Sequence, residues 1–126
     1  MTSTAEIDFG KVEALAGQIV GLMSGAAICA GIRLGDELGL YRALANGRAV
    51  TADELAGTLS LDARLTREWL DGQAASGLLK YDAAPDRYSM SAEAAMVLAD
   101  EDSPAFLAGG IGTFEAMYAE IGRAHV

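Results

Sequence analysis

Few side chains in this 126-residue sequence are of the types that carry out catalysis or bind metal ions. The single cysteine, Cys29, lies in an apolar run without a basic neighbour, so we expect a buried, unreactive thiol. The consecutive acids at Asp100–Asp102 have no second cluster to complete a metal site, and we expect a solvated loop. The glycine cluster Gly109–Gly112 lies inside a helical pattern, whereas a dinucleotide-binding loop needs a strand before it. These residues predict no catalytic, cofactor-binding or metal site within this sequence.

Basic residues are the other feature with chemical meaning, because free cations bind the phosphates of DNA. In one predicted helix, two arginines each have an acid four positions later, the spacing at which helical side chains meet. In a predicted hairpin, two basic residues are matched in number by two acids. With a net charge of −9 and a pI near 4.4, the chain has the opposite balance to a nucleic-acid-binding protein, so we expect no DNA binding. The sets are Arg64 with Glu68, Arg67 with Asp71, and Lys80 and Arg87 with Asp82 and Asp86.

These basic residues lie in a region where capping residues predict two helices. Thr51 and Glu54 form a T-x-x-E capping box at the start of the first helix, and Asp62 is placed to cap the second. Gly77, which tolerates the left-handed conformation, ends the second helix. We expect the tryptophan of that helix to anchor the core. The residues at core spacing are Leu65, Trp69, Leu70 and Ala74.

Two β-prone runs follow the helices. They cover Leu78–Tyr81 and Arg87–Met90, and Ala83–Asp86 between them has the composition of a hairpin turn. Val50, ahead of the first helix, is placed to pair with this hairpin. Helix, turn, helix and hairpin in this order predict a winged helix. The expected fold class is mainly α with a small β-hairpin, extra N-terminal dimerisation helices and a C-terminal linker helix.

The residues ahead of the winged helix predict two apolar helices, Asp8–Met23 and Gly25–Leu38, with a break at Gly25 and a short helical turn at Leu40–Leu44. Their apolar surface is larger than a domain of this size needs, and such surface usually contacts a partner. A two-fold dimer is the commonest arrangement, so we expect a homodimer, with packing inside the monomer as the alternative. The residues expected at the dimer interface are Leu15, Ile19, Leu22, Met23 and Ile28.

The stretch from Ala14 to Ile32 has no charged residue and is about as long as a membrane span. However, Gln18 and Ser24 interrupt it, its glycines and alanines lower its hydrophobicity, and the residues before it are acidic, unlike those of a signal peptide. We therefore expect buried helices and no membrane association. A single cysteine permits no internal disulfide, which is typical of proteins from a reducing compartment, and we expect a cytoplasmic location.

Two more helices are predicted toward the C-terminus. Ser91 is placed to cap the first, and Ser103 followed by Pro104 predicts the start of the second. We therefore divide the chain into a winged-helix dimerisation domain at residues 1–98 and, at residues 99–119, an acidic link with the start of a connector helix. The apolar residues of the connector helix include Phe114, Met117 and Tyr118.

The last residues, 120–126, continue the apolar pattern poorly. A plausible back-translation of Glu120–Val126, GAG-ATC-GGA-AGA-GCA-CAC-GTC, contains the start of a widely used sequencing-library adaptor, AGATCGGAAGAGCACACGTC. We therefore hypothesise that adaptor, rather than the gene, encodes the chain from about Ile121 onward, and a different codon set would contradict this hypothesis. The only histidine, His125, then has no catalytic or metal-binding role.

Taken in order, these features resemble the N-terminal winged-helix domain of bacterial class I S-adenosylmethionine-dependent methyltransferases. The resemblance covers nearly everything from Gly25 to about Tyr118, and the order of the motifs carries it rather than any single motif. The segments concerned are Leu34–Leu44, Thr51–Ala56, Arg67–Leu70, Gly77–Tyr81 and Ala99–Pro104.

The resemblance implies that this domain dimerises and covers the substrate side of an enzyme whose Rossmann-like second domain binds S-adenosylmethionine. The present sequence has no strand followed by a glycine-rich loop, so we expect a truncated, inactive methyltransferase that binds no cofactor by itself. In the full-length parent, Phe114, Met117 and Tyr118 are candidates to line the pocket of a small-molecule methyl acceptor, with ordinary packing as the alternative. A winged-helix transcription regulator that binds DNA as a dimer is the alternative function, and a structural interaction domain is a third.

Overall fold

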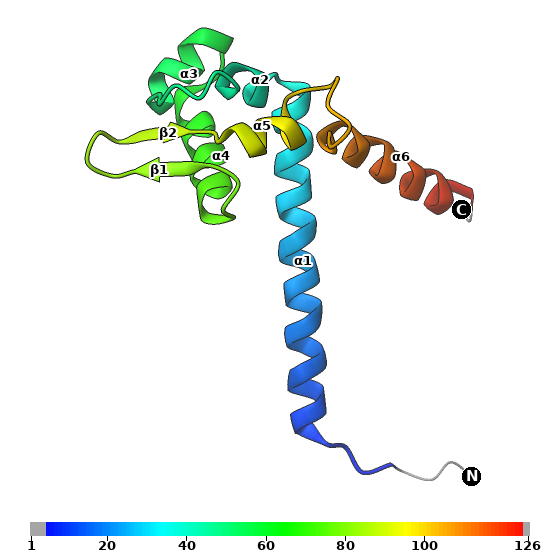
Figure 1. The fold of residues 1–126 in the computed structure, drawn as a ribbon. Coiled ribbons are helices and arrows are strands. Elements are labelled where there is room, and N and C mark those ends of the chain that lie inside the picture. The colour runs from blue at the N-terminus through cyan, green and yellow to red at the C-terminus, as the bar shows by residue number, and fades with distance from the viewer. Residues whose placement is uncertain (1–4, 125–126) are drawn as a thin grey trace.

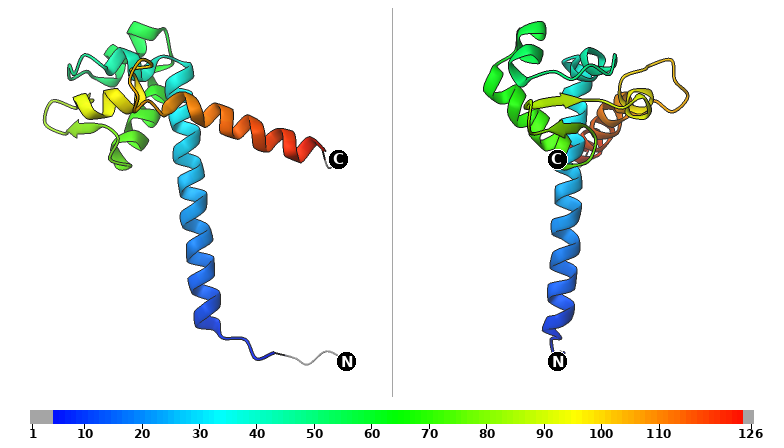
Figure 2. Two further views of the ribbon diagram at one scale, coloured as in Figure 1. Left: turned by 45° about the vertical axis from the view of Figure 1, so that its right-hand side comes forward. Right: turned by 60° about the vertical axis from the view of Figure 1, so that its left-hand side comes forward.

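The computed structural model describes residues 5–124, which form six helices and a two-stranded hairpin. Residues 40–98 form a winged-helix head, and two helices, one before and one after it, project from the head in different directions (Figures 1 and 2). Along the chain the elements are α1 (Phe9–Glu37), α2 (Leu40–Leu44), α3 (Ala52–Leu59), α4 (Ala63–Ala75), β1 (Lys80–Asp82), β2 (Arg87–Ser89), α5 (Ala92–Leu98) and α6 (Ala108–Ala124).

Both helices of the helix-turn-helix begin at the predicted caps. The backbone N–H of Glu54 donates to Thr51 Oγ1 and that of Thr51 to Glu54 Oε2, each at 3.1 Å, so the capping box is confirmed. Asp62 Oδ1 accepts from the N–H of Leu65 at 2.8 Å. These bonds satisfy backbone groups that a helix start leaves free, so local sequence determines where α3 and α4 begin. Helix α4 ends at Ala75, and Gly77 follows in the left-handed region with φ +79.

The predicted hairpin is also confirmed, with shorter strands. Strands β1 and β2 pair antiparallel with Tyr81 opposite Tyr88, and the N–H of Asp86 closes the turn on the carbonyl of Ala83 at 3.2 Å. Val50 extends the hairpin as predicted, through two backbone hydrogen bonds of 2.8 and 2.9 Å with Tyr88. The wing is thereby tied to the segment that leads into α3.

Trp69 anchors the core and attaches α1 to the head. Its indole Nε1 donates to the carbonyl of Gly31 at 2.8 Å, and its ring packs against Tyr41 with centroids 5.2 Å apart. Leu65, in contrast, is 54% exposed, so its predicted place in the core is wrong. The large core residues are Leu40, Tyr41, Leu44, Leu55, Trp69, Leu70, Leu79, Tyr88, Met90 and Leu98.

The predicted break at Gly25 is wrong, because α1 is one continuous helix of 29 residues. An interior glycine costs a helix only about 1 kcal/mol relative to alanine, and long apolar helical sequence on both sides of Gly25 outweighs that cost. Asp8 caps the helix through its carboxylate, which accepts from the N–H groups of Gly10 and Lys11. Only the C-terminal end of α1 contacts the head, and the rest projects away from it (Figure 1).

Ser91 caps α5 as predicted, but the last helix begins at Ala108 rather than at Pro104. The Ser103 hydroxyl accepts from the N–H of Ala105 in a local turn, and the N–H of Leu107 donates to the carbonyl of Val97 at 2.8 Å. These bonds hold the chain against α5 and delay the helix. The predicted glycine cluster does lie inside α6. His125 lies outside the described residues, and the adaptor hypothesis for residues 120–126 stays a prediction.

Gly35→Ala tests the attachment of α1 to the head. A Cβ at this position would lie 2.5 Å from Tyr41 and 2.6 Å from Trp69, so the two rings must move. Overpacking of this kind costs about 1–3 kcal/mol, and we expect a loss of this size in urea denaturation. The control is Gly21→Ala, where a Cβ meets nothing within 4 Å and which should be neutral or slightly stabilising. Equal stability of the two variants would contradict the packing described here.

Candidate interaction surface

The outer face of α4 and the wing carry basic residues that are held by carboxylates. Arg64 pairs with Glu68 at 2.8 Å, as its spacing predicted. Arg87 of the wing makes two hydrogen bonds to Glu54 of α3, at 3.0 and 3.2 Å, rather than pairing within the hairpin. The acid that caps α3 therefore also holds the wing.

Arg67 does not pair with Asp71, so that prediction is wrong. It makes two hydrogen bonds, of 3.0 and 2.8 Å, to Asp86 at the tip of the wing, and Asp86 also accepts from the hydroxyl of Tyr81 at 2.7 Å. Asp71 instead accepts from the hydroxyl of Tyr88, a buried residue that needs an acceptor. The fold of the wing over α4 brings these partners together, which spacing along a single helix does not reveal.

These contacts set the protonation of the groups involved. The bonds from Arg67 and then from Tyr81 lower the pKa of Asp86, and the bond to Asp86 raises the pKa of the Tyr81 hydroxyl. Burial, followed by the bond to Asp71, raises the pKa of Tyr88. Asp86 thus stays ionised, and its bonds with Arg67 persist, at neutral pH.

The face that would read DNA in a winged-helix regulator therefore offers few free cations. Among the described residues of the head, Arg48 and Lys80 are the basic residues without an ion pair. Two isolated cations do not form the row that neutralises successive phosphates.

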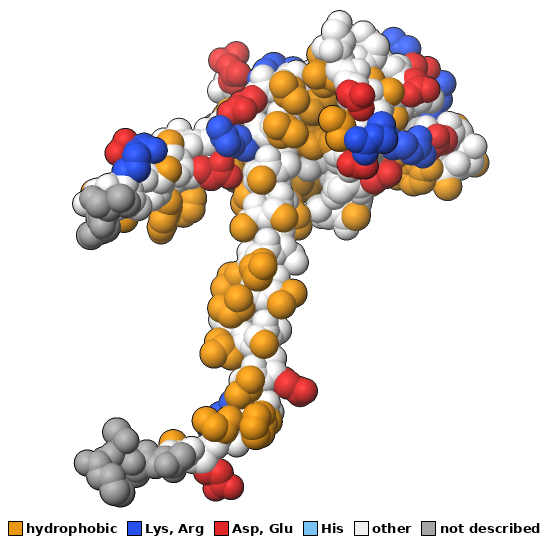
Figure 3. All heavy atoms as spheres, turned by 180° about the vertical axis from the view of Figure 1, so that it is seen from behind, with side chains coloured by type: hydrophobic (Ala, Val, Ile, Leu, Met, Phe, Trp, Pro, Cys, Tyr) orange, Lys and Arg blue, Asp and Glu red, His pale blue; other side chains and the backbone are white. Residues whose placement is uncertain are grey.

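Helix α1, which was predicted to be buried, is exposed along most of its length, so that prediction is wrong. Ile19 is 48% and Met23 65% exposed, and Cys29, also predicted to be buried, is exposed. The helix extends beyond the head, and no other described element covers this part (Figure 3). The exposed large apolar residues of α1 are Phe9, Val12, Leu15, Ile19, Val20, Leu22, Met23, Ile28 and Leu34.

By length and composition, α1 is also the one described helix that could cross a membrane, with a mean hydropathy of 1.7. Length and composition do not distinguish a membrane from a protein partner, since apolar helices of soluble proteins meet the same criteria. The absence of membrane association stays a prediction.

Helix α6 leans against α1, and an apolar cleft of about 560 Å³ opens between them. Arg33 of α1 holds α6 at this point through an ion pair of 3.4 Å with Glu115. Of the three predicted substrate-lining residues, Phe114 lines the cleft, and the ring of Tyr118 packs against that of Phe114 at a tilt of 51°, with centroids 4.9 Å apart. Met117 is 51% exposed on α6, and the substrate role of all three residues stays a prediction.

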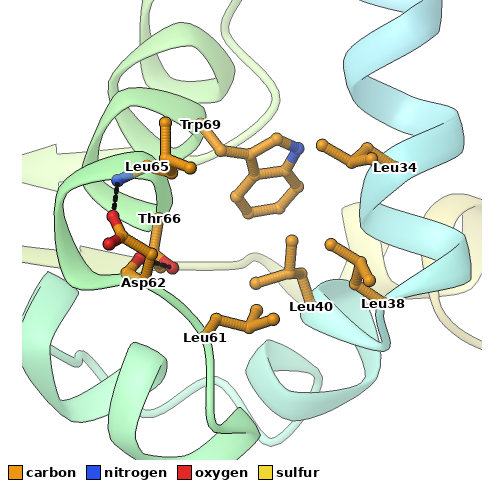
Figure 4. A pocket seen from close by; sticks show the side chains of 8 residues that line it. All are labelled: Leu34, Leu38, Leu40, Leu61, Asp62, Leu65, Thr66 and Trp69. Carbon is orange, nitrogen blue, oxygen red and sulfur yellow. Dashed lines mark hydrogen bonds between the residues drawn. The ribbon is translucent and has the colours of Figure 1, made fainter.

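A second apolar pocket, of about 160 Å³, lies where α1 ends against α4 (Figure 4). We call it the leucine pocket. Its polar edge is Asp62, whose carboxylate is already engaged with the N–H of Leu65. The exposure of Leu65 is explained by its place in this wall. The lining residues are Leu34, Leu38, Leu40, Leu61, Asp62, Leu65, Thr66 and Trp69.

Residues 5–124 contain no group of three or more side chains that could bind a metal ion. In the predicted acidic loop, Glu101 pairs with Arg42 at 3.4 Å instead. The features that the described chain offers to other molecules are therefore apolar: the face of α1, the cleft and the leucine pocket.

The fold corresponds to a known domain family. A family model of the Rv2258c-like winged HTH domain matches residues 26–100, from the C-terminal part of α1 to the end of α5. The chain belongs to this family. In this Rv2258c-like domain, the match includes the anchoring residue Trp69 and the paired cations of α4 and the wing.

Solved structures with the same fold are methyltransferases in which this chain corresponds to the N-terminal region. PigF with SAH is 23% identical, with a TM-score of 0.68 over 79% of this chain and 28% of that chain. Mitomycin 7-O-methyltransferase MmcR is 24% identical, with a TM-score of 0.66 over 80% of this chain and 31% of that chain. An O-methyltransferase family protein from Burkholderia thailandensis is 18% identical, with a TM-score of 0.64 over 94% of this chain and 32% of that chain.

The Rv2258c-like chain thus spans less than a third of the length of these three structures. Because the Burkholderia thailandensis match leaves out so little of the chain, it includes most of the projecting helix α1. Further matching structures carry SAH or SAM. No curated protein matches the sequence significantly.

The paired carboxylates predict how stability depends on pH. The bonds from the Thr51 N–H and from Arg87 lower the pKa of Glu54, and the bond from Arg67 lowers that of Asp86. A carboxyl group whose pKa is lowered by folding adds stability above its unfolded pKa of about 4, and this stability is lost as the pH falls through the folded value. We expect the urea midpoint to fall below about pH 4, and to fall less steeply in the Glu54→Gln/Asp86→Asn variant. Identical pH profiles for both proteins would contradict this role.

Proposed function

We propose that this chain is the dimerisation and substrate-capping N-terminal domain of an S-adenosylmethionine-dependent methyltransferase that acts on a small molecule. The full-length parent binds S-adenosylmethionine in a second domain, and the 126-residue chain binds no cofactor by itself. The parent is a cytoplasmic homodimer that associates neither with DNA nor with a membrane.

The observation that carries the proposal is that the head buries its apolar residues in a core, while α1 and α6 expose theirs. The core of the head is closed, and no buried polar side-chain atom among the described residues lacks a partner. Helices α1 and α6, in contrast, present large apolar side chains to solvent, including Leu22, Met23 and Phe114. Exposed apolar surface on this scale marks an interaction site. A domain of this kind serves to join polypeptides.

The relatives give the proposal its enzymatic context. In methyltransferases such as PigF and MmcR, a region of this fold makes up less than a third of the chain. If the same organisation holds here, α6 leads into the catalytic domain, and the cleft at Phe114 lies where α6 meets α1. An apolar cleft beside the catalytic domain suits the apolar part of a small acceptor molecule.

Cofactor binding tests the enzymatic part of the proposal. A polypeptide that continues this sequence with the genomic coding sequence downstream of Met117 should bind S-adenosylmethionine in isothermal titration calorimetry. The 126-residue chain should release no binding heat, because a dry, oriented cofactor site requires the second domain. Failure of the extended protein to bind the cofactor would contradict the proposal.

A DNA shift assay tests the alternative of a transcription regulator. We expect no shift with the wild-type chain, since its cations are engaged. The Glu68→Gln/Asp86→Asn variant, which frees Arg64 and Arg67, should bind duplex DNA weakly and lose that binding as salt rises. Salt-sensitive binding by the wild-type chain would favour the regulator.

A further inference from the structure

Besides the cleft and the leucine pocket, a groove lies between α1 and α4, and it contains a polar group that the fold leaves unused. Gln73 of α4 is only 3% exposed. Its Oε1 accepts from the hydroxyl of Tyr41, whereas its Nε2 makes no hydrogen bond within residues 5–124. Every fully enclosed side-chain nitrogen and oxygen of these residues has a partner, so Nε2 must be accessible from the groove. The groove has a volume of about 320 Å³, and its lining residues are Ala27, Ile28, Gly31, Glu68, Trp69, Gly72, Gln73 and Ser76.

The neighbours of Gln73 determine which way its amide faces. Tyr41 is buried, and burial raises the pKa of its hydroxyl, so the hydroxyl keeps its proton at neutral pH and needs an acceptor. Within the described residues that acceptor is Gln73 Oε1, and turning the amide over would remove it. The nitrogen therefore faces Gly31, where a Cβ would lie 3.1 Å from it. Because the carbonyl of Gly31 already accepts from the indole of Trp69, the groove ends on a free hydrogen-bond donor.

This donor points to a ligand. A buried N–H without an acceptor costs free energy, and sites for small molecules combine mostly apolar walls with a few placed polar groups. We propose that the α1–α4 groove binds a neutral small molecule, whose carbonyl or amide oxygen accepts a hydrogen bond from Gln73 Nε2. The groove is separate from the cleft lined by Phe114, since the two share no lining residue, and this site therefore goes beyond the proposed function.

The other polar groups of the groove favour a neutral ligand. Glu68 lies at the edge with its side chain 64% exposed, and this carboxylate repels an anion, as does the net charge of −9. A cation would meet the positive end of the Gln73 N–H bonds, and Glu68 is already paired with Arg64 at 2.8 Å. The Ser76 hydroxyl is engaged as well, because it donates to the carbonyl of Gly72 at 2.8 Å. An uncharged acceptor is therefore the ligand group that this site selects.

The remaining walls suit a flat apolar group beside the oxygen. Gly31 and Gly72 bring backbone rather than side chains to the groove, and a Cβ on Gly72 would meet nothing within 4 Å. Ala27 and Ile28 add apolar contacts from α1, and the ring of Trp69 adds an aromatic one from α4. An aromatic amide such as acetanilide carries both parts, a ring and a carbonyl oxygen, and is therefore a suitable probe.

Side-chain amide signals in the NMR spectrum of the isotope-labelled 126-residue chain test the proposal. The chain has two glutamines and one asparagine, so Gln18 and Asn46 provide internal controls for Gln73. Acetanilide should shift the amide signals of Gln73 and the indole signal of Trp69, the only tryptophan, and leave the two control amides in place. N-ethylaniline, which has the same ring and chain but no carbonyl oxygen, should bind about three- to tenfold more weakly, since one hydrogen bond is lost.

Gly31→Ala closes the approach to the donor while keeping the donor itself. Its Cβ would lie 3.1 Å from Gln73 Nε2, so the affinity for acetanilide should fall about tenfold. The control is Gly21→Ala on the same helix, which lies outside the groove and where a Cβ meets nothing within 4 Å. The Tyr41→Phe/Gln73→Met variant removes both partners of the buried hydrogen bond, which costs less stability than removing one. It should bind acetanilide and N-ethylaniline equally, as followed by the indole signal of Trp69.

Circular dichroism of each variant ensures that only folded proteins are compared. Equal affinity of the wild-type chain for acetanilide and N-ethylaniline, or no shift of the Gln73 amide with acetanilide, would overturn the proposal and indicate that water satisfies the donor. Tighter binding of para-acetamidobenzoate, which adds a carboxylate to acetanilide, would overturn the neutral ligand class. None of these results bears on the proposed function, because that function is tested by cofactor binding to the extended protein.

Discussion

The contact between Trp69 and the glycines of α1 fixes how this long helix is attached to the head. Gly35 lets the rings of Tyr41 and Trp69 lie where a Cβ would be, and Gly31, one turn earlier, accepts the indole hydrogen bond. Buried Gln73 accepts from the Tyr41 hydroxyl and lies against Gly31, so the contact is polar as well as apolar. Because these contacts occupy only the last turns of α1, they fix its direction while most of the helix projects beyond the head.

The head has a closed core, whereas α1 and α6 leave large apolar side chains exposed. The head buries its tyrosines and leucines and satisfies its buried polar groups, such as Thr66, whose hydroxyl donates to the carbonyl of Asp62 at 2.7 Å. The apolar surface left over lies on α1 and α6, on the two sides of the cleft lined by Phe114. Hydrophobic surface in water is unfavourable in proportion to its area, so this excess favours association.

The head was predictable from the sequence because its signals are local. Thr51, Asp62 and Ser91 each cap a helix through a bond to a backbone group within three residues, and Gly77 ends α4 through its own backbone conformation. The pairing of Arg64 with Glu68 is local in the same sense.

The predictions that were wrong depended on distant contacts. Arg67 bonds with Asp86 rather than Asp71 because the wing lies over α4, and Leu65 is exposed because its side chain lines a pocket shared with α1. The signal at Ser103-Pro104 was overridden by the bond from Leu107 to α5. The burial expected for α1 also failed, because hydrophobic periodicity identifies an apolar face but does not indicate what, if anything, covers it.

The ion pairs also distinguish the outer face of this winged helix from a face suited to binding DNA. A fold fixes where side chains lie, whereas function depends on which of them are free to interact. Here Asp86 and Glu54 occupy the arginines that would face phosphates, and these carboxylates also fasten the wing to α4 and α3. Freeing the cations would therefore loosen the wing, so the electrostatics that stabilise this head also oppose its use as a DNA reader. One set of ion pairs therefore both stabilises the head and leaves few free cations on its outer face.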